Sequence, residues 1–252
     1  MSMKITLITA TYNSETSIKT CIESVLSQDY PEVEHLIIDG VSTDSTLNIV
    51  KDFLKKHDHI TLISEPDQGI YDALNKGISK ATGEVIGFVH SDDFLASENV
   101  LSEIASQFEK KKCDGVYGDL EYVDKQNTNK IMRYWKSCPF TLKLLKKGWM
   151  PAHPTLFLKQ EIYKKHGIFD QNFKIAADYD FILRIFKDQQ LNFIYLPMVI
   201  TKMRTGGASN RSLKNVITKS KEDYKALNKN QIGGWSTLFI KNVSKLSQFY
   251  KK

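Results

Sequence analysis

Residues 5–26 read ITLITATYNSETSIKTCIESVL and hold the first two elements of the fold. The short apolar and β-branched run at 5–10 predicts a buried strand. Asn13 and Ser14 supply helix-capping side chains, and apolar residues then recur at helical spacing. The segment therefore predicts a strand that leads into a helix packed on it.

The alternation of strand and helix continues through residue 89. Further apolar runs predict strands, and segments with apolar residues at helical spacing separate them. The predicted strands lie at 36–38, 60–63 and 85–89, with helices at 47–54 and 70–78. Regular alternation of this kind predicts an α/β fold with a mostly parallel sheet that helices cover on both faces.

The pattern loosens beyond Ser97, but no linker interrupts it. A strand is predicted at 115–123 and a partner strand at 130–135. No stretch rich in Gly, Ser or Pro occurs before residue 205. We therefore expect residues 1–205 to form one compact domain.

The composition is that of a globular protein. Of 252 residues, 41% are hydrophobic and 25% are charged, so the chain can bury a sizeable core. Three cysteines at long, irregular spacing form neither a disulfide set nor a zinc-binding pair. No apolar run approaches the roughly 18 to 20 residues that span a bilayer, and the N-terminus lacks a signal-peptide pattern. We expect a cytoplasmic protein, at most peripheral on the inner face of the cell membrane.

The net charge of +6 is unevenly distributed along the chain. From Arg211 to Lys252 there are ten Lys or Arg residues against two acids, which leaves 25 basic and 27 acidic residues for 1–210. A nucleic-acid module would carry its basic stripe over the folded domain. The distribution instead predicts a nearly neutral body with a cationic tail and no nucleic-acid partner.

Polar residues gather at the carboxyl ends of the predicted strands, where ligands bind in open α/β sheets. They are 11–13, Asp39, 65–67, Asp92 and Asp93. Asp, Asn and Pro also end strands for structural reasons, which explains any one position more readily than all of them. The adjacent Asp92 and Asp93 would repel each other unless a cation relieves them, and their hard oxygen ligands suit Mg²⁺ or Mn²⁺.

The first strand is not followed by a common nucleotide-binding motif. Neither G-x-G-x-x-G nor G-x-x-x-x-G-K-[ST] occurs there, which argues against a dinucleotide-dependent oxidoreductase and a P-loop NTPase. The first loop also lacks the glycine-rich, arginine-containing stretch of sugar nucleotidylyltransferases. The remaining possibility is a nucleotide held by side chains and a metal.

Five runs, taken together and in order, resemble the family 2 glycosyltransferases of GT-A fold. The runs are 5–13 (ITLITATYN), 24–30 (SVLSQDY), 37–46 (IIDGVSTDST), 65–77 (EPDQGIYDALNKG) and 91–93 (SDD). The resemblance covers about residues 4 to 205 and implies a catalytic domain, with a nucleotide-sugar-binding half at 1–96 and an acceptor-side half at 97–205. It also implies inverting transfer of a sugar from a nucleoside-diphosphate donor, with a UDP-sugar expected. The acceptor would be a hydroxyl of a saccharide or glycolipid, usually in the synthesis of a bacterial surface polysaccharide.

The resemblance implies roles for five residues that would hold the nucleoside. Thr9, Thr11 and Tyr12 would flank the base. Asp39 would bond the base, and Asp67 would close over the nucleoside. Taken alone, Tyr12 also fits a packed surface aromatic, and Asp39 also fits a turn residue.

The same resemblance gives the adjacent acids separate roles. Asp92 would meet the ribose or the donor sugar, and Asp93 would bind a Mg²⁺ or Mn²⁺ ion that bridges the diphosphate. The ion would stabilise the charge of the leaving group as a Lewis acid. His90 lies outside the acid pair and is expected to be an ordinary residue at the end of a strand.

The second half would supply the acceptor side. Residues 150–157 resemble the family's segment before the catalytic helix, which places His153 near the acceptor or donor sugar. A structural histidine fits this position equally well. Where the family carries a Glu-Asp pair, this chain has Ala177 and Asp178, so Asp178 remains in the position of the catalytic base.

Asp178 and Asp180 are the two candidates for the general base, and residues two apart do not share a helix face. Asp178 begins a stripe of apolar residues at i+3, i+4 and i+7, where partial desolvation is expected to raise its pKa. Asp180 has Arg184 at i+4 and Lys187 at i+7, which predicts an exposed ion pair. We therefore expect Asp178 to be the base.

The segment 206–252 is predicted to combine a flexible junction, over 205–210, with a basic and aromatic-rich extension over 211–252. A basic amphipathic helix with aromatic residues can lie on an anionic membrane. A C-terminal helix that covers the body with its lysines outward fits the same pattern. An acceptor carried on a lipid favours the membrane slightly.

Two other functions fit parts of the sequence. A nucleotidyl or phosphosugar transferase would need the glycine-rich first loop that is missing here. A catalytically silent nucleotide-sugar or glycan binding subunit would not need Asp93 and Asp178. The metal-dependent glycosyltransferase therefore fits best.

Overall fold

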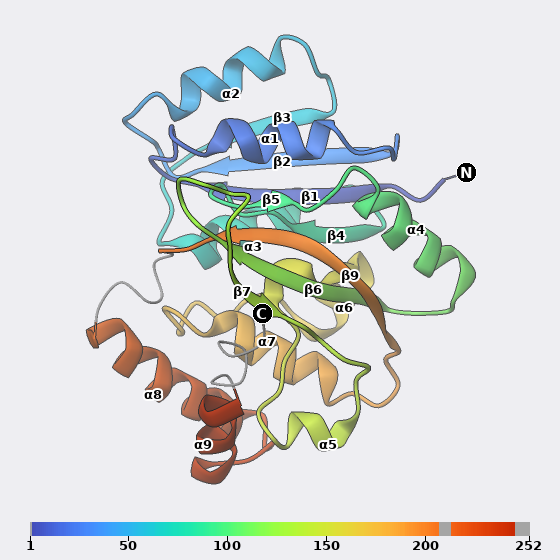
Figure 1. The fold of residues 1–252 in the computed structure, drawn as a ribbon, viewed down its shortest axis with the longest axis vertical. Coiled ribbons are helices and arrows are strands. Elements are labelled where there is room, and N and C mark those ends of the chain that lie inside the picture. Colours follow the sequence, from blue (N-terminus) through green and yellow to red (C-terminus); the bar gives the residue numbers. More distant parts are fainter. Residues whose placement is uncertain (1, 207–212, 245–252) are drawn as a thin grey trace.

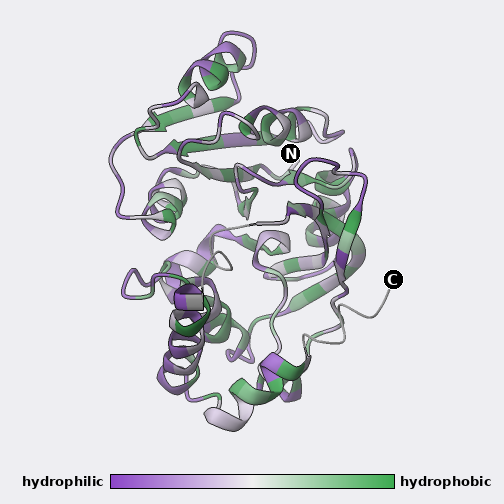
Figure 2. Ribbon diagram, turned by 60° about the vertical axis from the view of Figure 1, so that its left-hand side comes forward, coloured by the Kyte–Doolittle hydropathy of each residue, from purple (hydrophilic) through white to green (hydrophobic). Residues whose placement is uncertain are grey.

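The structure is a computed structural model that describes residues 2–206 and 213–244. In the described part of the chain, nine strands form one curled sheet with helices packed around it (Figure 1). The strand order is β3-β2-β1-β4-β8-β6-β9-β5, and β7 pairs with β6. Hydrophobic residues are concentrated in the strands (Figure 2). The architecture confirms the predicted α/β class.

The first half of the sheet is parallel, as the sequence predicts. Its strands are β1 (Ile5–Thr11), β2 (Val33–Asp39), β3 (Ile60–Ser64) and β4 (Val85–Phe88), which alternate with helices α1 (Ile18–Leu26), α2 (Thr46–Leu54) and α3 (Ile70–Lys80). All residues of β1 are buried because β2 and β4 flank it and helices cover both of its faces. Leu7 packs in a cluster with Cys21 of α1, whereas Ile8 packs in a cluster with Leu74 of α3. Because these strands run parallel, their carboxyl ends lie along the same edge of the sheet.

The second half of the sheet, for which the sequence predicts no strand direction, is mixed. Strands β6 and β9 run parallel, whereas β5, β7 and β8 each pair antiparallel with a neighbour. The elements of this half are β5 (Phe94–Leu95), α4 (Val100–Lys110), β6 (Gly115–Val123), β7 (Ile131–Trp135), α5 (Leu142–Leu145), η1 (His153–Thr155), β8 (Phe157–Lys159), α6 (Gln160–His166), α7 (Ala177–Phe186) and β9 (Phe193–Arg204). The strands predicted at 115–123 and 130–135 are β6 and β7.

Two C-terminal helices, α8 (Leu213–Lys229) and α9 (Trp235–Ser244), pack on the body near α7 (Figure 1). Ala226, Leu227 and Leu238 belong to the main hydrophobic core. Within 213–244, the C-terminal segment therefore covers the body, which is one of the two arrangements that its sequence pattern fits. Most of the junction predicted at 205–210 lies outside the described residues.

Glu222 of α8 connects this C-terminal segment to the start of α7. Its carboxylate accepts the backbone N–H groups of Lys174, Ile175 and Ala176 at 2.8 to 3.0 Å. These groups precede the first turn of α7, where an acidic side chain stabilises a helix through hydrogen bonds and through its charge. A residue of α8 therefore fixes the N-terminus of α7.

Candidate functional site

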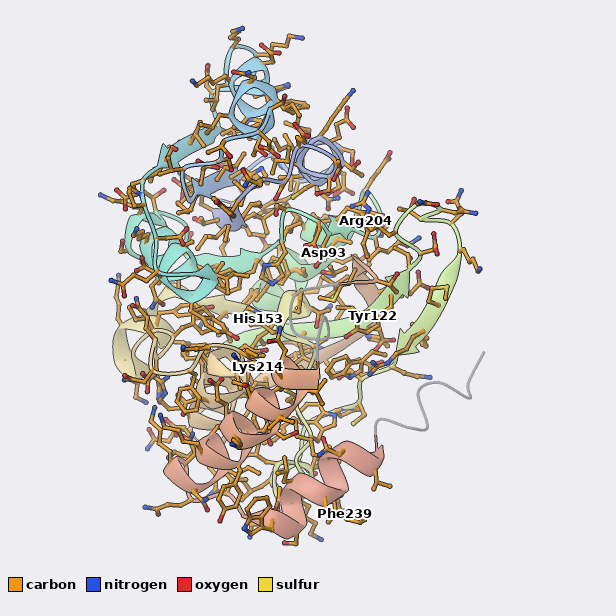
Figure 3. All side chains as sticks on the ribbon, turned by 90° about the vertical axis from the view of Figure 1, so that its left-hand side faces the viewer. Asp93, Tyr122, His153, Arg204, Lys214 and Phe239 are labelled. Atoms are coloured by element: carbon orange, nitrogen blue, oxygen red, sulfur yellow. The ribbon has the colours of Figure 1, made fainter. Side chains whose placement is uncertain are left out.

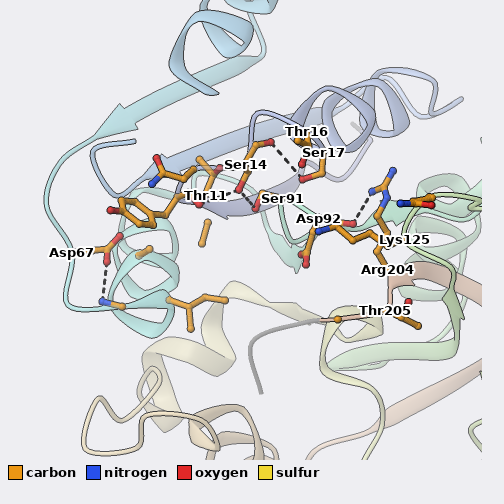
Figure 4. A pocket seen from close by; sticks show the side chains of 18 residues that line it. Thr11, Ser14, Thr16, Ser17, Asp67, Ser91, Asp92, Lys125, Arg204 and Thr205 are labelled. Atoms are coloured by element: carbon orange, nitrogen blue, oxygen red, sulfur yellow. Dashed lines mark hydrogen bonds between the residues drawn. The ribbon is translucent and has the colours of Figure 1, made fainter. Parts of the chain in front are cut away.

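A cavity of about 900 Å³ lies at the carboxyl ends of the parallel strands (Figure 4). Its walls come from the loop after β1, the loop before α3, the segment after β4 and the ends of β6 and β9. The lining residues are Ala10, Thr11, Tyr12, Asn13, Ser14, Thr16, Ser17, Asp67, Gly69, Ile70, Ala73, Ser91, Asp92, Lys125, Gln126, Arg204, Thr205 and Gly206. The two halves of the sheet thus share this cavity.

Four of the residues predicted from the sequence line the cavity. Tyr12 is 62% exposed, so its ring is available for a planar ligand. The hydroxyl of Thr11 is buried and has no hydrogen-bond partner among the described residues, which leaves it available to a ligand. Asp67 accepts the backbone N–H of Gly69 at 2.8 Å and so shapes the loop before α3. Asp92 lies at the opposite end of the cavity from Asp67 (Figure 4).

Thr9 does not reach the cavity, which corrects the role inferred for it. It is fully buried, and its hydroxyl donates to the carbonyl of Val89 at 2.7 Å and lies 2.9 Å from Nε2 of His35. Thr9 is on the same face of β1 as Thr11 but two residues earlier, beneath α1. It therefore supports the floor of the site from within the sheet.

Asp39 organises a loop and is also absent from the cavity lining. Its fully buried carboxylate accepts the backbone N–H and the hydroxyl of Ser42 and the hydroxyl of Ser64, at 2.5 to 3.0 Å. Ser42 in turn receives the N–H of Asn13 at 2.9 Å, which ties the loop after β2 to the loop after β1. The alternative of a turn residue fits this geometry better than a direct bond to a base.

Asp93 lies behind Asp92 and is 1% exposed. One carboxylate oxygen accepts the backbone N–H of Arg204 at 3.2 Å, and Figure 3 shows the two residues together. Burial and the neighbouring charge of Asp92 raise the pKa of Asp93 well above its usual value. A buried carboxylate beside a second one, with little to neutralise it, is a place where a cation lowers the energy.

The acid pair can accept a divalent ion when phosphate is present. No cluster of three or more His, Cys, Asp or Glu side chains suited to a metal occurs within 2–206 and 213–244. Mg²⁺, however, is commonly held by one or two carboxylates together with substrate phosphates and water. The residues therefore fit a metal that arrives with a diphosphate.

Asp178 lies in the first turn of α7 and is partly buried. One of its carboxylate oxygens is 3.1 Å from the hydroxyl of Tyr71, which also lies 2.7 Å from the carbonyl of Ile175. Tyr71 belongs to the first turn of α3, directly after the loop that carries Asp67. Helix α3 therefore contacts the acid of α7, although neither Tyr71 nor Asp178 lines the cavity.

The pKa of Asp178 is below its ordinary value, so the expectation of a raised pKa was wrong. Burial raises it, but the charges of His153, Lys219 and Lys241, together with the backbone N–H of Tyr179, outweigh burial. Burial lowers the pKa of His153 to about 4, so the histidine is neutral at pH 7, where Lys219, Lys241 and the backbone N–H of Tyr179 remain to lower the pKa of Asp178. Both lysines come from the C-terminal helices, far from Asp178 in the sequence.

Asp180 is fully buried, which corrects the prediction of an exposed ion pair. The expected bond to Arg184 is present at 3.0 Å. The second partner is Lys229 at 3.0 Å rather than Lys187, and the side-chain amide of Asn230 donates to the same carboxylate at 2.9 Å. Asp180 therefore anchors the end of α8 to α7.

The buried His153 lies beside the half-buried His90, with ring centroids 5.9 Å apart. His153 is 6% exposed, contacts the ring of Phe88 in a tilted arrangement and has no partner for Nε2 in the described part of the chain. Figure 3 places it between Asp93 and Lys214 of α8. His153 does not line the cavity, so its predicted contact with a sugar stays a prediction.

Sequence reasoning missed the cations of the cavity, Lys125 and Arg204. Lys125 follows β6, and Arg204 ends β9. Ligands bind at the carboxyl ends of parallel strands. This rule would also have indicated Lys125 and Arg204 if the parallel pairing of β6 with β9 had been known from the sequence.

Comparisons with known proteins agree with this geometry. The model of Glycosyl transferase family 2 matches residues 6–175. A PGL/p-HBAD biosynthesis glycosyltransferase from Mycobacterium bovis (strain BCG / Pasteur 1173P2) is 30% identical over 207 residues, which are 81% of this chain and 78% of that protein.

Solved structures share the fold. S. aureus TarS in complex with UDP-GlcNAc matches with a TM-score of 0.71 and 20% identity, over 90% of this chain and 65% of that chain. The chain thus spans slightly less than two thirds of that TarS structure. Mannosyltransferase PcManGT from Pyrobaculum calidifontis, in complex with GDP-Man and Mn²⁺, matches with a TM-score of 0.70 and 19% identity, over 98% of this chain and 71% of that chain.

The curled α/β sheet with a cavity at its strand ends is the GT-A fold of glycosyltransferases. The chain belongs to glycosyl transferase family 2. In residues 2–206 and 213–244, no helix has the length and apolar character needed to cross a bilayer.

Proposed function

We propose that this protein transfers a sugar from a UDP-sugar to a hydroxyl of a saccharide or lipid-linked saccharide, with inversion at the anomeric carbon. The observation that carries the proposal is the cavity shared by the two halves of the sheet, whose lining includes polar residues at strand ends. Asp178 does not line this cavity, but it contacts Tyr71, which directly follows the lining residue Ile70. The UDP-GlcNAc bound to TarS and the name of the mycobacterial relative support the donor and acceptor classes.

The nucleoside would occupy the end of the cavity that Tyr12 and Asp67 form. The exposed ring of Tyr12 can stack on the base, and the free hydroxyl of Thr11 can bond the nucleoside. Gly40 permits Asp67 to come close, since a Cβ at residue 40 would lie 2.4 Å from its carboxylate. Asp39 would act indirectly by fixing the loop beside them.

The diphosphate would lie toward Asp92, with Asp93 behind it. Asp92 would meet the ribose or the donor sugar, and the two carboxylates would hold Mg²⁺ or Mn²⁺ together with phosphate oxygens. When bound, the ion would supply Lewis-acid stabilisation of the leaving diphosphate. The Mn²⁺ in the PcManGT complex supports this assignment.

Asp178 would be the general base. Its lowered pKa keeps it ionised at neutral pH, and the Tyr71 hydroxyl fixes one carboxylate oxygen. The acceptor oxygen would form a bond to the anomeric carbon while the bond to the diphosphate oxygen breaks and its electron pair leaves with the diphosphate. The proton of the acceptor hydroxyl would pass to Asp178.

Helix α9 would place the enzyme on an anionic membrane. Trp235, Phe239 and Val243 recur every four residues and are 68%, 70% and 47% exposed. Leu238 packs into the core, and the ring of Trp235 stacks on that of Tyr224 in α8. The rest of the stripe, which includes Phe239 (Figure 3), remains exposed. An exposed aromatic stripe on a basic segment is typical of interfacial helices.

A screen of nucleotide sugars tests the function directly. Purified protein with Mn²⁺ or Mg²⁺ should hydrolyse one donor slowly, and the same donor should raise the melting temperature because it binds only the folded state. Binding without turnover, with every acceptor class tried, would favour a silent nucleotide-sugar binding subunit instead.

A further inference from the structure

We propose that Lys125 and Arg204 form a cation clamp that binds the donor's diphosphate and stabilises the nucleoside diphosphate as it leaves. This inference rests on the proposed function. When the bond from the anomeric carbon to the diphosphate oxygen breaks, its electron pair stays on that oxygen. The two side chains would offset the charge that develops there.

Adjacent parallel strands bring the two residues to the same end of the cavity. Val123, at the end of β6, is the register partner of Arg204, and the N–H of Thr205 donates to the carbonyl of Val123 at 2.9 Å. Lys125 follows two residues after Val123. Figure 4 shows Lys125 and Arg204 on the side of Asp92, away from Asp67. A donor whose base lies by Asp67 would extend its phosphates toward them.

The surroundings of Arg204 hold its guanidinium at the cavity wall. One guanidinium nitrogen donates to the backbone carbonyl of Asp92 at 2.7 Å, and the group lies 5.0 Å from the ring centroid of Phe94. Neither Arg204 nor Lys125 forms an ion pair with a carboxylate of the described residues. Both charges therefore remain available for an anion, and the bond to Asp92 orients Arg204 before the ligand arrives.

Lys125 is placed by a short turn. The carboxylate of Asp124 accepts the backbone N–H groups of Gln126 and Asn127, both at 2.9 Å. Such a turn fixes the backbone on both sides of Lys125, while its exposed side chain can reach into the cavity.

The charges of the cavity favour such a clamp. Asp67 and Asp92 line it, and Asp93 lies just behind, so the acidic residues alone would repel a diphosphate. Lys125 and Arg204 are the cations among the described lining residues, and both lie at the phosphate end. They complement a divalent ion, because side-chain cations and a metal can contact different phosphate oxygens.

Isothermal titration of UDP and uridine, at one fixed Mn²⁺ concentration, separates a phosphate contact from a nucleoside contact. Lys125→Gln and Arg204→Gln should each weaken UDP binding by about tenfold, the range for losing a charge-assisted hydrogen bond, with uridine affinity unchanged. Arg204→Lys should recover part of the loss. Matched controls are Lys130→Gln in the same loop and Lys202→Gln on β9, which do not line the cavity and should leave both affinities unchanged.

The outcomes distinguish the clamp from the function on which it rests. Unchanged UDP affinity in both variants would overturn the clamp, as would an equal loss for UDP and uridine, because that result indicates a distorted pocket. If the native protein binds neither UDP nor uridine, the proposed UDP-sugar donor is wrong, whether or not another nucleotide binds. The proposed clamp for UDP is then wrong as well. Lys125→Gln changes an exposed side chain, so this variant still tests the clamp if Arg204→Gln does not fold.

Discussion

The donor side and the acceptor side of this protein position their acids by different means. On the donor side, Asp39 and Asp67 bond to backbone and hydroxyl groups within a few residues or on the neighbouring strand. On the acceptor side, Asp178 and Asp180 depend on α3, α8 and α9, which are far away in the sequence. Local loops thus build the proposed nucleotide site, whereas packing between distant helices builds the surroundings of the proposed base.

The largest expected effect concerns the donor side. If Asp93 holds a cation with the diphosphate, Asp93→Ala should abolish metal-dependent UDP binding and turnover, because the cation would lose a carboxylate ligand. Titration calorimetry with and without Mn²⁺, and a turnover assay, measure this, with the exposed Asp58→Ala as a control. Full activity in EDTA would show that the reaction does not depend on a metal.

On the acceptor side, Asp178→Asn should lower transfer by a factor of at least about 100, with donor affinity nearly unchanged, because only the proton acceptor is lost. Asp180→Asn is the matched variant. It should keep near-normal transfer per folded molecule but lose about 2 kcal/mol of unfolding free energy in urea titrations, since its charge serves Arg184 and Lys229. If the two effects on transfer are reversed, the base is assigned to the wrong residue.

Helices α8 and α9 supply lysines that lower the pKa of Asp178, and α9 also carries the exposed apolar stripe. Trp235→Ser combined with Phe239→Ser should lower co-sedimentation with anionic vesicles at least about tenfold, without changing hydrolysis of a soluble donor. High salt should weaken the binding of the native protein. Ile131→Ser, at another exposed apolar residue, is the control. Absence of vesicle binding by the native chain would leave α9 with a packing role alone.

The smallest effect is expected where the two sides touch. Tyr71→Phe removes the hydroxyl near Asp178 and should lower kcat about fivefold, the value of one hydrogen bond. Since the bond favours the ionised carboxylate, its loss should raise the pKa of Asp178 and move the acidic limb of the kcat profile to higher pH. Tyr30→Phe, whose hydroxyl bonds the carbonyl of Met3, should change neither. An unshifted acidic limb would show that Tyr71 does not act on the base.

The sequence alone predicts much of the donor side and less of the acceptor side. Strand ends are local features, so Thr11, Tyr12, Asp67 and Asp92 could be assigned to one cavity from periodicity and resemblance. The deep position of Thr9 depends on its cover by α1, which the strand pattern does not reveal.

The pKa of Asp178 and the burial of Asp180 could not be predicted from the sequence near them. Their partners Lys219, Lys229 and Lys241 lie in a segment whose position on the body is set by tertiary packing. Helical spacing correctly predicted the pair between Asp180 and Arg184, because that contact is internal to one helix.

The carboxylate of Glu222 has a practical consequence for anyone who recombines members of this family. The family match ends at residue 175, and Glu222 bonds the backbone N–H groups of residues 174–176 from beyond that boundary. A chimera joined between α7 and α8 would inherit the base from one parent and the cap of its helix from the other. Residues 174–176 and Glu222 therefore have to come from the same parent if the cap is to be kept.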